Sequence, residues 1–323
     1  MSSVPRVTET TVMVDEELGG DTAWATFRKH RREIAVESFR RFRFGDGFSH
    51  SRALGLQLAL TLLPLMIAAV GLANSLYMDD AGMVMRRTLL FLTPGPSDPV
   101  VRTAFEHSVA DDASQIALWV GLLFAVISMT TGMGQVERGA NRIYGIQRDR
   151  PTVQKYTRAF SMAVIAGFPA LAGYALLIAA PAFSEAIEDI YGIDDDTIEW
   201  IALPLGLCLL MAAITLMLRL GPRRRQPSWS WLVLGAVVTL ALWLIFTALV
   251  ALYLAFSDRL GNVYGPLTGV VVLLLWSMLS SVAIFVGLAI CAQTEARLAG
   301  GHQGAFDDRE AELAPTGSDD GAS

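Results

Sequence analysis

The sequence predicts an all-α protein that crosses a membrane six times. Its 323 residues are 53% hydrophobic and only 17% charged, whereas soluble domains are about one-quarter charged. The apolar residues gather in six runs, and each run is long enough to cross about 30 Å of hydrocarbon as a helix. Arginine and lysine are concentrated in alternate connections between these runs, as a consistent membrane topology requires.

The first 20 residues are polar and acidic. They lack the basic start and the short apolar core of a cleavable signal peptide. We therefore expect residues 1–20 to be disordered. We also expect the first span to act as the insertion signal and to remain in the protein.

Residues 21–44 predict an amphipathic helix within an N-terminal segment that extends to residue 52. One side is apolar and much of the rest is basic: the apolar side has Trp24, Phe27, Ile34, Ala35 and Phe42, and the basic part has Arg28, Lys29, Arg32, Arg40 and Arg43. Such a helix lies either in the headgroup region of an anionic membrane or against its own protein in the cytoplasm. The tripeptide Gly45-Asp46-Gly47 is expected to end it.

The membrane domain is predicted over residues 53–298. Its six spans are expected at about 53–77, 114–134, 159–183, 198–218, 229–256 and 266–291. The connection over residues 78–113 is too long for a plain loop, and it predicts two short external helices around a Pro/Gly break at residues 93–96. Residues 299–323 are acidic with a single aromatic residue and predict a disordered tail.

The basic residues assign a side of the membrane to every connection. Residues 1–52, 135–158 and 219–228 and the residues after the sixth span (292–323) together carry 21 Arg and Lys, and the other three connections carry 4. Because Lys and Arg near span ends resist translocation, the first group and both termini are placed in the cytoplasm. One missed span would scramble this division, so it supports all six spans together.

The polar residues predicted at depth are uncharged. No Asp, Glu, Lys or Arg lies near a span centre, where ion-coupled transporters place ionisable groups. Gln57 is the costliest polar side chain to bury unpaired, so it is expected to face a cavity or a partner. Pro64 and Pro204 match between two three-span halves, as interrupted transporter helices do, but Pro204 is expected near a helix start, where proline is harmless.

No residue pattern predicts an enzyme. The four histidines (His30, His50, His107 and His302) are isolated, and no nucleotide, metal or nucleophile motif is present. The acidic residues over 185–196 fit a solvated outer loop better than a cation site. Arg223-Arg224-Arg225 fits a cytoplasmic loop better than a nucleic-acid site. We predict no catalytic residue, no cofactor, no metal and no nucleic-acid partner.

Residues 135–158 carry six Arg and Lys and predict a helix that continues the second span. Glu137 and Asn141 share one face at i,i+4 spacing, and Arg138 and Arg142 share the next. This helix is expected to stop near Gly145. The neutral Asn141 has no part in the positive-inside rule, so we predict that it caps a neighbouring helix or holds a backbone carbonyl.

The residues from Glu137 to Tyr144, ERGANRIY, resemble the E-x-A-L-N-R-I-W stretch of the YihY/BrkB family of bacterial inner-membrane proteins. Val263-Tyr264-Gly265-Pro266-Leu267, with Leu275-Trp276 and Gly287 beyond it, resembles that family's final span. The first span and Gly235-Ala236 are similar as well. The resemblance implies six spans, cytoplasmic termini and a role in envelope integrity or virulence. One branch of the family is associated with export of lipopolysaccharide precursors, and a former ribonuclease BN label was withdrawn.

Three functional hypotheses follow. The favoured one is a non-enzymatic protein that handles or transports an envelope lipid or lipid-linked precursor. Arg52, Arg138 and Arg142 would contact headgroup phosphates, and Glu137 and Asn141 would orient them; otherwise these five residues only anchor topology and helix ends. The second hypothesis is a scaffold that recruits envelope proteins, or a second copy of the chain, through the N-terminal helix and the tail. The third is a ribonuclease, which would need clustered metal ligands that the scattered histidines do not supply.

Overall fold

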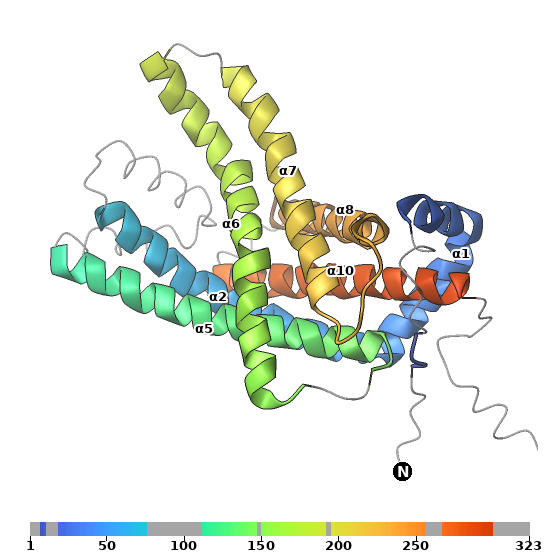
Figure 1. The fold of residues 1–323 in the computed structure, drawn as a ribbon. Helices are drawn as coiled ribbons and strands as arrows, with labels where there is room; N and C mark the ends of the chain where they lie inside the picture. The colour runs from blue at the N-terminus through green and yellow to red at the C-terminus, as the bar shows by residue number, and fades with distance from the viewer. Residues whose placement is uncertain are drawn as a thin grey trace, which may run out of the picture.

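The computed structural model describes residues 7–10, 19–75, 111–146, 150–191, 195–255 and 267–299. The elements within these ranges are all α-helices, which confirms the predicted all-α class. They are α1 (Gly20–Phe44), α2 (Gly47–Ser75), α5 (Asp111–Ile143), α6 (Thr152–Tyr191), α7 (Asp195–Leu220), α8 (Trp229–Ala255) and α10 (Leu267–Leu298), as drawn in Figure 1.

Six helices, α2, α5, α6, α7, α8 and α10, are long and apolar enough to cross a membrane. They confirm the six predicted spans. Several continue beyond the apolar run that predicted them, because a helix does not have to end where the hydrocarbon ends. The 40 residues of α6 make a helix about 60 Å long at 1.5 Å per residue. Likewise, α5 continues past its apolar run to Ile143, as the helix predicted to stop near Gly145 does.

The six long helices form a ring. Helix α2 packs between α5 and α10, α10 packs on α8, α8 on α7, α7 on α6, and α6 returns to α5. Small residues let some neighbours approach closely, as is usual between membrane helices. A methyl group added to Gly287 of α10 would lie 2.7 Å from the carbonyl oxygen of Gly235 of α8, and one added to Gly173 of α6 would lie 2.8 Å from that of Gly206 of α7. These contacts define tight α8–α10 and α6–α7 seams.

The hairpin of α6 and α7 diverges from the other helices toward the end where α6 meets α7 (Figure 1). In α5, every residue from Trp119 to Ile127 is exposed except Gly121, which packs on α2, and the buried Ala125. The side of α5 that faces away from α2 is therefore uncovered along this half of the helix.

One face of α1 is folded against the membrane domain. Ile34 and Phe42 are buried, and α1 packs on α10 and α8. Trp24 and Ala35, which the sequence places on the same apolar side, are exposed instead. Of the two alternatives for this helix, packing against its own protein therefore holds for one of its faces only.

Four expectations about the ends and breaks of the chain are revised or lie outside the described residues. Pro204 does not lie near a helix start, because α7 begins at Asp195 and Pro204 is in its interior. Disorder does not extend over the whole of residues 1–20, because Val7 and Thr10 are buried against the membrane domain. The predicted external helices of residues 78–113 fall almost entirely outside the described residues, as does nearly all of the predicted tail.

Candidate functional site

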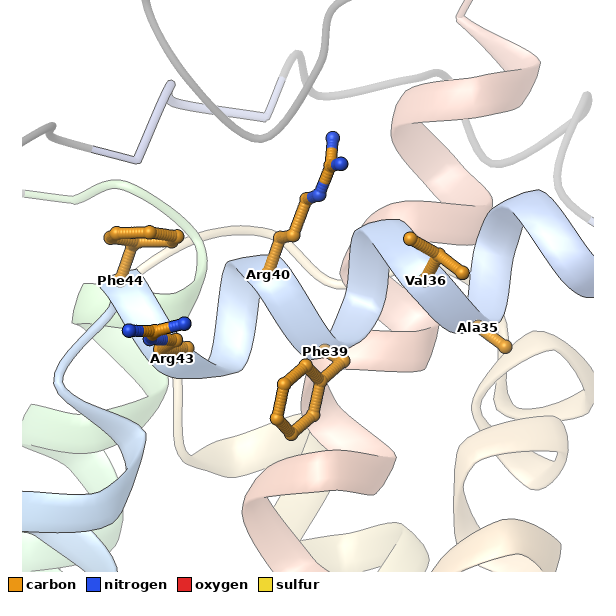
Figure 2. Close-up of a pocket in the computed structure, with 6 residues that line it drawn as sticks. All are labelled: Ala35, Val36, Phe39, Arg40, Arg43 and Phe44. Atoms are coloured by element: carbon orange, nitrogen blue, oxygen red, sulfur yellow. The ribbon is translucent and has the colours of Figure 1, made fainter.

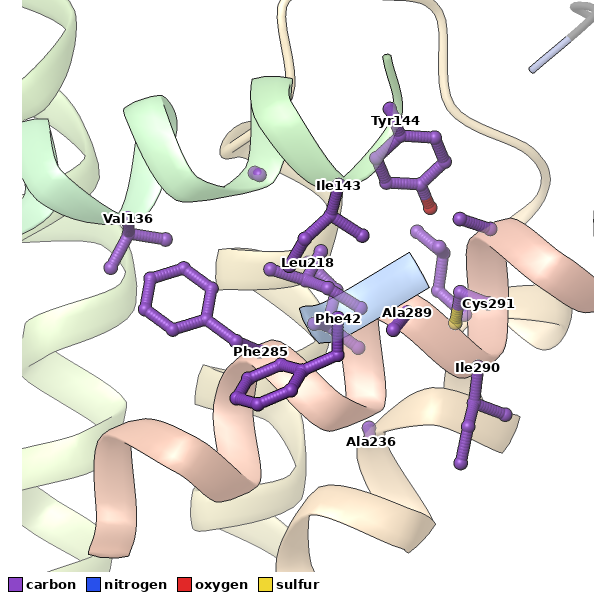
Figure 3. Close-up of a cluster of buried hydrophobic side chains, with 14 of the residues drawn as sticks. Phe42, Val136, Ile143, Tyr144, Leu218, Ala236, Phe285, Ala289, Ile290 and Cys291 are labelled. Carbon is purple, nitrogen blue, oxygen red and sulfur yellow. The ribbon is translucent and has the colours of Figure 1, made fainter. Parts of the chain in front are cut away.

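The polar residues gather at one end of the ring. This arginine-rich end is where α1, the last turns of α5, α7 and α10, and the first turns of α2, α6 and α8 meet. Beneath it lies an apolar layer to which all seven described helices contribute, including Phe42, Ile143, Leu218, Trp231 and Phe285, most of them labelled in Figure 3. This layer gives the charged side chains above it fixed positions.

Arg41 joins three segments that are distant in the sequence. It is 1% exposed, and its guanidinium donates to Oε1 of Gln293 at 3.0 Å and to the backbone oxygens of Ile143 at 3.1 Å and Thr8 at 3.2 Å. Burial lowers the pKa of Arg41 to about 10. Since its donors are used by protein acceptors, Arg41 holds α1, α5, α10 and the N-terminal residues together.

A second buried arginine lies beside it. Arg224, in the connection between α7 and α8, forms an ion pair with the fully buried Glu295 of α10. Its guanidinium carbon also lies 4.8 Å from the centre of the Tyr144 ring, a cation–π distance. Burial, followed by the nearby Cys291 and Glu295, raises the pKa of Tyr144 well above its usual value. Tyr144 therefore stays a neutral phenol between the charged groups.

Glu137 and its basic neighbours form a separate cluster between α5, α6 and α7. Glu137 is fully buried, and its Oε1 lies 2.6 Å from Nη1 of Arg150. The pair is an ion pair by distance although its angle is poor for a hydrogen bond, and Oε2 has no hydrogen-bond partner among the described residues. Lys155 is 8% exposed. Arg158 donates to the backbone oxygen of Leu220 at 3.4 Å. We call Glu137, Arg150, Lys155 and Arg158 the Glu137 cluster.

Asn141 lies one turn after Glu137 and is also buried. Its Oδ1 accepts a hydrogen bond of 2.7 Å from the backbone N–H of Arg223. The helix ends at Ile143, and Gly145, at φ +79°, follows in the left-handed conformation, as the expected stop near this glycine requires.

The remaining candidate residues are spread over two helices. Arg52 of α2 and Arg142 of α5 are exposed at the arginine-rich end, and Arg138 is half-buried. Gln57 is deeper, where its Nε2 donates to the backbone oxygen of Ser128 at 3.0 Å and joins α2 to α5. The structure therefore gives Gln57 a partner within the protein.

Several residues of this end escaped the sequence analysis. Arg41 was one of many arginines in the N-terminal segment, and Glu295 was a single acid after the last apolar run. Arg150 and Lys155 counted only as positive charges of a loop. A lone acidic residue beside an apolar run, as with Glu137 and Glu295, was the available signal, since such a group is seldom buried without a cationic partner.

Three aromatic side chains contact one another inside the ring of helices. Tyr174 of α6 lies 5.7 Å from Trp243 of α8 and 6.1 Å from Trp276 of α10, measured between ring centres. Trp243 and Trp276 are 6.2 Å apart, and all three pairs are edge-to-face. The Trp276 indole donates to Oγ1 of Thr247 at 3.1 Å. This aromatic triad is a contact between the α6–α7 hairpin and the α8–α10 pair.

The outward face of α1 is both apolar and basic (Figure 2). Ala35, Val36, Phe39, Arg40, Arg43 and Phe44 line a shallow open groove on it. Phe39 is 55% exposed. Arg40 forms an exposed ion pair with Glu37 at 2.9 Å. Exposed aromatic rings beside arginines are typical of a surface that contacts lipid headgroups.

The fold and the distribution of its charges define a multi-pass membrane protein with six apolar spans. The chain belongs to the virulence factor BrkB family, whose model matches residues 38–311. This confirms the resemblance drawn from residues 137–144 and the final span.

Two groups of relatives are similar to the chain. It is 23% identical to the ribonuclease-like protein YfkH of Bacillus subtilis strain 168, over 78% of this chain and 91% of that protein. It is 23% identical to a UPF0761 membrane protein of Stenotrophomonas maltophilia strain K279a, over 83% of this chain, and 30% identical to one of Alteromonas mediterranea, over 63%. The matches span 63% and 65% of those two proteins. No solved structure matches the chain significantly.

Proposed function

We propose that this chain is a non-enzymatic protein of the bacterial cytoplasmic membrane that moves or presents an envelope lipid, with the arginine-rich end and both termini in the cytoplasm. The orientation rests on the 21-to-4 division of basic residues. Arg52, Arg138 and Arg142 would lie at the level of the inner headgroups, where each basic residue contributes about 1 kcal/mol of attraction to anionic lipid.

The observation that carries the proposal is the divergence of the α6–α7 hairpin (Figure 1). At the arginine-rich end the hairpin is tied to α5, through Asn141 and Arg223 and through Glu137 and Arg150. Further away it contacts the α8–α10 pair through Tyr174, and the adjacent flank of α5 is exposed. An exposed apolar flank beside the diverging hairpin suits a lipid chain, because the chain would reach it from the bilayer without crossing water.

The test is lipid movement in vesicles that contain the purified protein. The wild-type protein is expected to move a fluorescently labelled envelope lipid between leaflets. If the protein moves no labelled lipid, the transport hypothesis is excluded and the scaffold hypothesis remains. Metal-dependent cleavage of RNA by the purified protein, lost on replacing one of its own acidic residues, would instead establish an enzyme.

A cross-linking variant tests the hairpin directly. After Cys208 and Cys291 are replaced, Tyr174→Cys with Trp243→Cys would let a short reducible reagent join α6 to α8. Lipid movement should stop on cross-linking and return on reduction. The matched control is Trp243→Cys with Trp276→Cys, which joins α8 to α10. Because those helices already form a tight seam, that cross-link should add no restraint on the hairpin, and equal inhibition by both would contradict hairpin movement.

A scaffold role is favoured by a different observation, the exposed face of α1 (Figure 2). If this face recruits a protein, Val36→Ser with Phe39→Ser should abolish the envelope phenotype while lipid movement in purified vesicles stays normal. If the chain moves lipid by itself, loss of phenotype should follow loss of movement.

A further inference from the structure

We propose that the Glu137 cluster is a binding site for a phosphate-bearing anion, and that the anion is the phosphodiester of a lipid headgroup. This inference deepens the proposed function and rests on it. It places the headgroup contact on Arg150, Lys155 and Arg158, which the sequence analysis did not single out.

The first argument is the balance of charge. The cluster contains three cationic side chains and one carboxylate, of which Glu137 is fully buried, Lys155 is 8% exposed and the Arg150 side chain is 15% exposed. The three residues between Ile146 and Arg150 are Gln147, Arg148 and Asp149, which add no net charge. Among the described residues of α5, α6 and α7, the other carboxylates lie at the opposite helix ends. Excess positive charge that is largely withdrawn from water favours a bound anion.

The second argument is the supply of donors. Nε of Arg158 is buried and has no hydrogen-bond partner among the described residues. The bond that Arg158 does make, to Leu220, is long at 3.4 Å. Arginine is suited to phosphate because its planar fork donates two parallel hydrogen bonds to two oxygens.

The third argument is the position of the cluster at the start of α6. Arg150 precedes the helix, which begins at Thr152, and Lys155 and Arg158 lie in its first two turns. The first backbone N–H groups of a helix have no acceptor within it, and the positive end of the helix dipole lies there. A phosphate at this place would receive these amides together with the side chains. The Cε of Lys155 lies against α5, near the position that a methyl on Gly134 would take, 3.8 Å away.

The position also fits an amphiphile. The cluster lies between α5 and α6 at the arginine-rich end, and the exposed flank of α5 from Trp119 to Ile127 begins further along the same pair of helices. A headgroup held by Arg150, Lys155 and Arg158 would therefore leave its acyl chains beside the apolar flank. A soluble phosphate would occupy the same donors without using that flank.

The experiment measures lipid binding by the purified full-length protein in neutral detergent, with phosphatidylglycerol, phosphatidylcholine and inorganic phosphate as the three probes. Thermal stabilisation and the lipid retained in native mass spectrometry are the readouts. Lys155→Gln with Arg158→Gln should weaken phosphatidylglycerol binding about tenfold or more. Arg225→Gln, which removes an exposed charge from the same end, should change it less than twofold.

The outcomes separate the alternatives. Stabilisation by phosphatidylglycerol but not by inorganic phosphate assigns the site to a lipid headgroup, and stabilisation by both shows that the phosphate oxygens suffice. If neither probe stabilises the protein, the site is overturned. It is also overturned if Arg225→Gln weakens phosphatidylglycerol binding as much as the double variant does. If the double variant does not fold, Arg158→Lys keeps the charge and loses the fork, and unchanged binding in that variant also overturns the proposal. Binding that depends on the cluster without lipid movement would reject transport and keep the site.

Discussion

The Oδ1 atom of Asn141 accepts a hydrogen bond of 2.7 Å from the backbone N–H of Arg223. Asn141 lies in the last turn of α5, and Arg223 lies just beyond the end of α7. The bond therefore ties the base of the α6–α7 hairpin to a helix of the ring. The sequence singled out this amide because topology gave it no role, and it predicted that Asn141 caps a neighbouring helix or holds a backbone carbonyl. The structure shows its side-chain oxygen bound to the backbone just beyond the end of α7.

Replacing Asn141 by alanine should destabilise the protein without changing its topology. The part-buried N–H of Arg223 would lose its acceptor, and a hydrogen bond of this kind contributes about 0.5–1.5 kcal/mol. Thermal unfolding in detergent measures the loss, and cysteine accessibility in cells reports the topology. Arg142→Ala changes the neighbouring exposed residue and should leave the unfolding temperature nearly unchanged. Equal unfolding temperatures in the two variants would show that the bond contributes nothing.

Glu137→Gln should destabilise the protein more than loss of an exposed ion pair does. The change leaves Arg150 without its carboxylate in a poorly hydrated place. The cost for fully buried pairs is about 3–5 kcal/mol, and we expect about 1–3 kcal/mol because the Arg150 side chain is 15% exposed. The double variant Glu137→Gln with Arg150→Gln should recover part of this loss, because no unpaired charge remains.

The control for that experiment is the exposed pair of Glu37 and Arg40 on α1, at 2.9 Å. Glu37→Gln should cost about 1 kcal/mol or less. A double-variant cycle that gives Glu137 and Arg150 the same small coupling would mean that water reaches their pair as freely as it reaches the exposed one.

The spans were predictable because each depends on a local property. A run of apolar residues must be helical in lipid, since no water is present to satisfy its backbone groups. The stop near Gly145 and the break at Gly45 and Asp46 were also local, because they depend on the few residues that precede and follow them.

The contacts of the arginine-rich end were not predictable, because they join residues far apart in the chain. Gln293 lies 252 positions from Arg41, and nothing around either residue indicates the other. Similarly, one face of α1 looked uniformly apolar, yet Ile34 is buried and Ala35 is exposed. Which of these two neighbouring residues points toward α10 depends on the angle at which the helices cross. The number of spans therefore followed from composition, while the site depended on tertiary packing.

The seam between α8 and α10 should not tolerate a side chain at Gly287. A methyl group there would lie 2.7 Å from the carbonyl oxygen of Gly235 and would also overlap Oγ1 of Thr239. Overpacking of this kind costs about 1–3 kcal/mol, so Gly287→Ala should lower the unfolding temperature. Gly134→Ala is the control, because the nearest atom to its added methyl is 3.8 Å away, and alanine favours the helix. A Gly287→Ala variant as stable as Gly134→Ala would show that α8 and α10 separate easily.

Tyr144 should make the protein sensitive to alkaline pH. Burial raises the pKa of this phenol above its usual value of 10, so its contribution to stability is fully present below pH 10. Above pH 10 the phenol ionises in the unfolded state while it stays protonated in the folded state. The unfolded state then binds fewer protons, and stability falls by about 1.4 kcal/mol per pH unit until the folded-state pKa is reached.

Tyr144→Phe removes this titration and keeps the ring beneath Arg224. The hydrogen bond that it loses, to Gln226, is long at 3.4 Å. Below pH 10 the two proteins should therefore differ by a small constant amount in unfolding temperature, and between pH 10 and 11 the variant should become the more stable one. Arg41, whose pKa is lowered by burial to about 10, acts in the opposite direction in this range but is common to both proteins. Tyr156→Phe, which removes an exposed phenol at the same end, is the control and should follow the wild type. If unfolding temperature depends on pH in the same way for Tyr144→Phe and the wild type, Tyr144 is open to solvent.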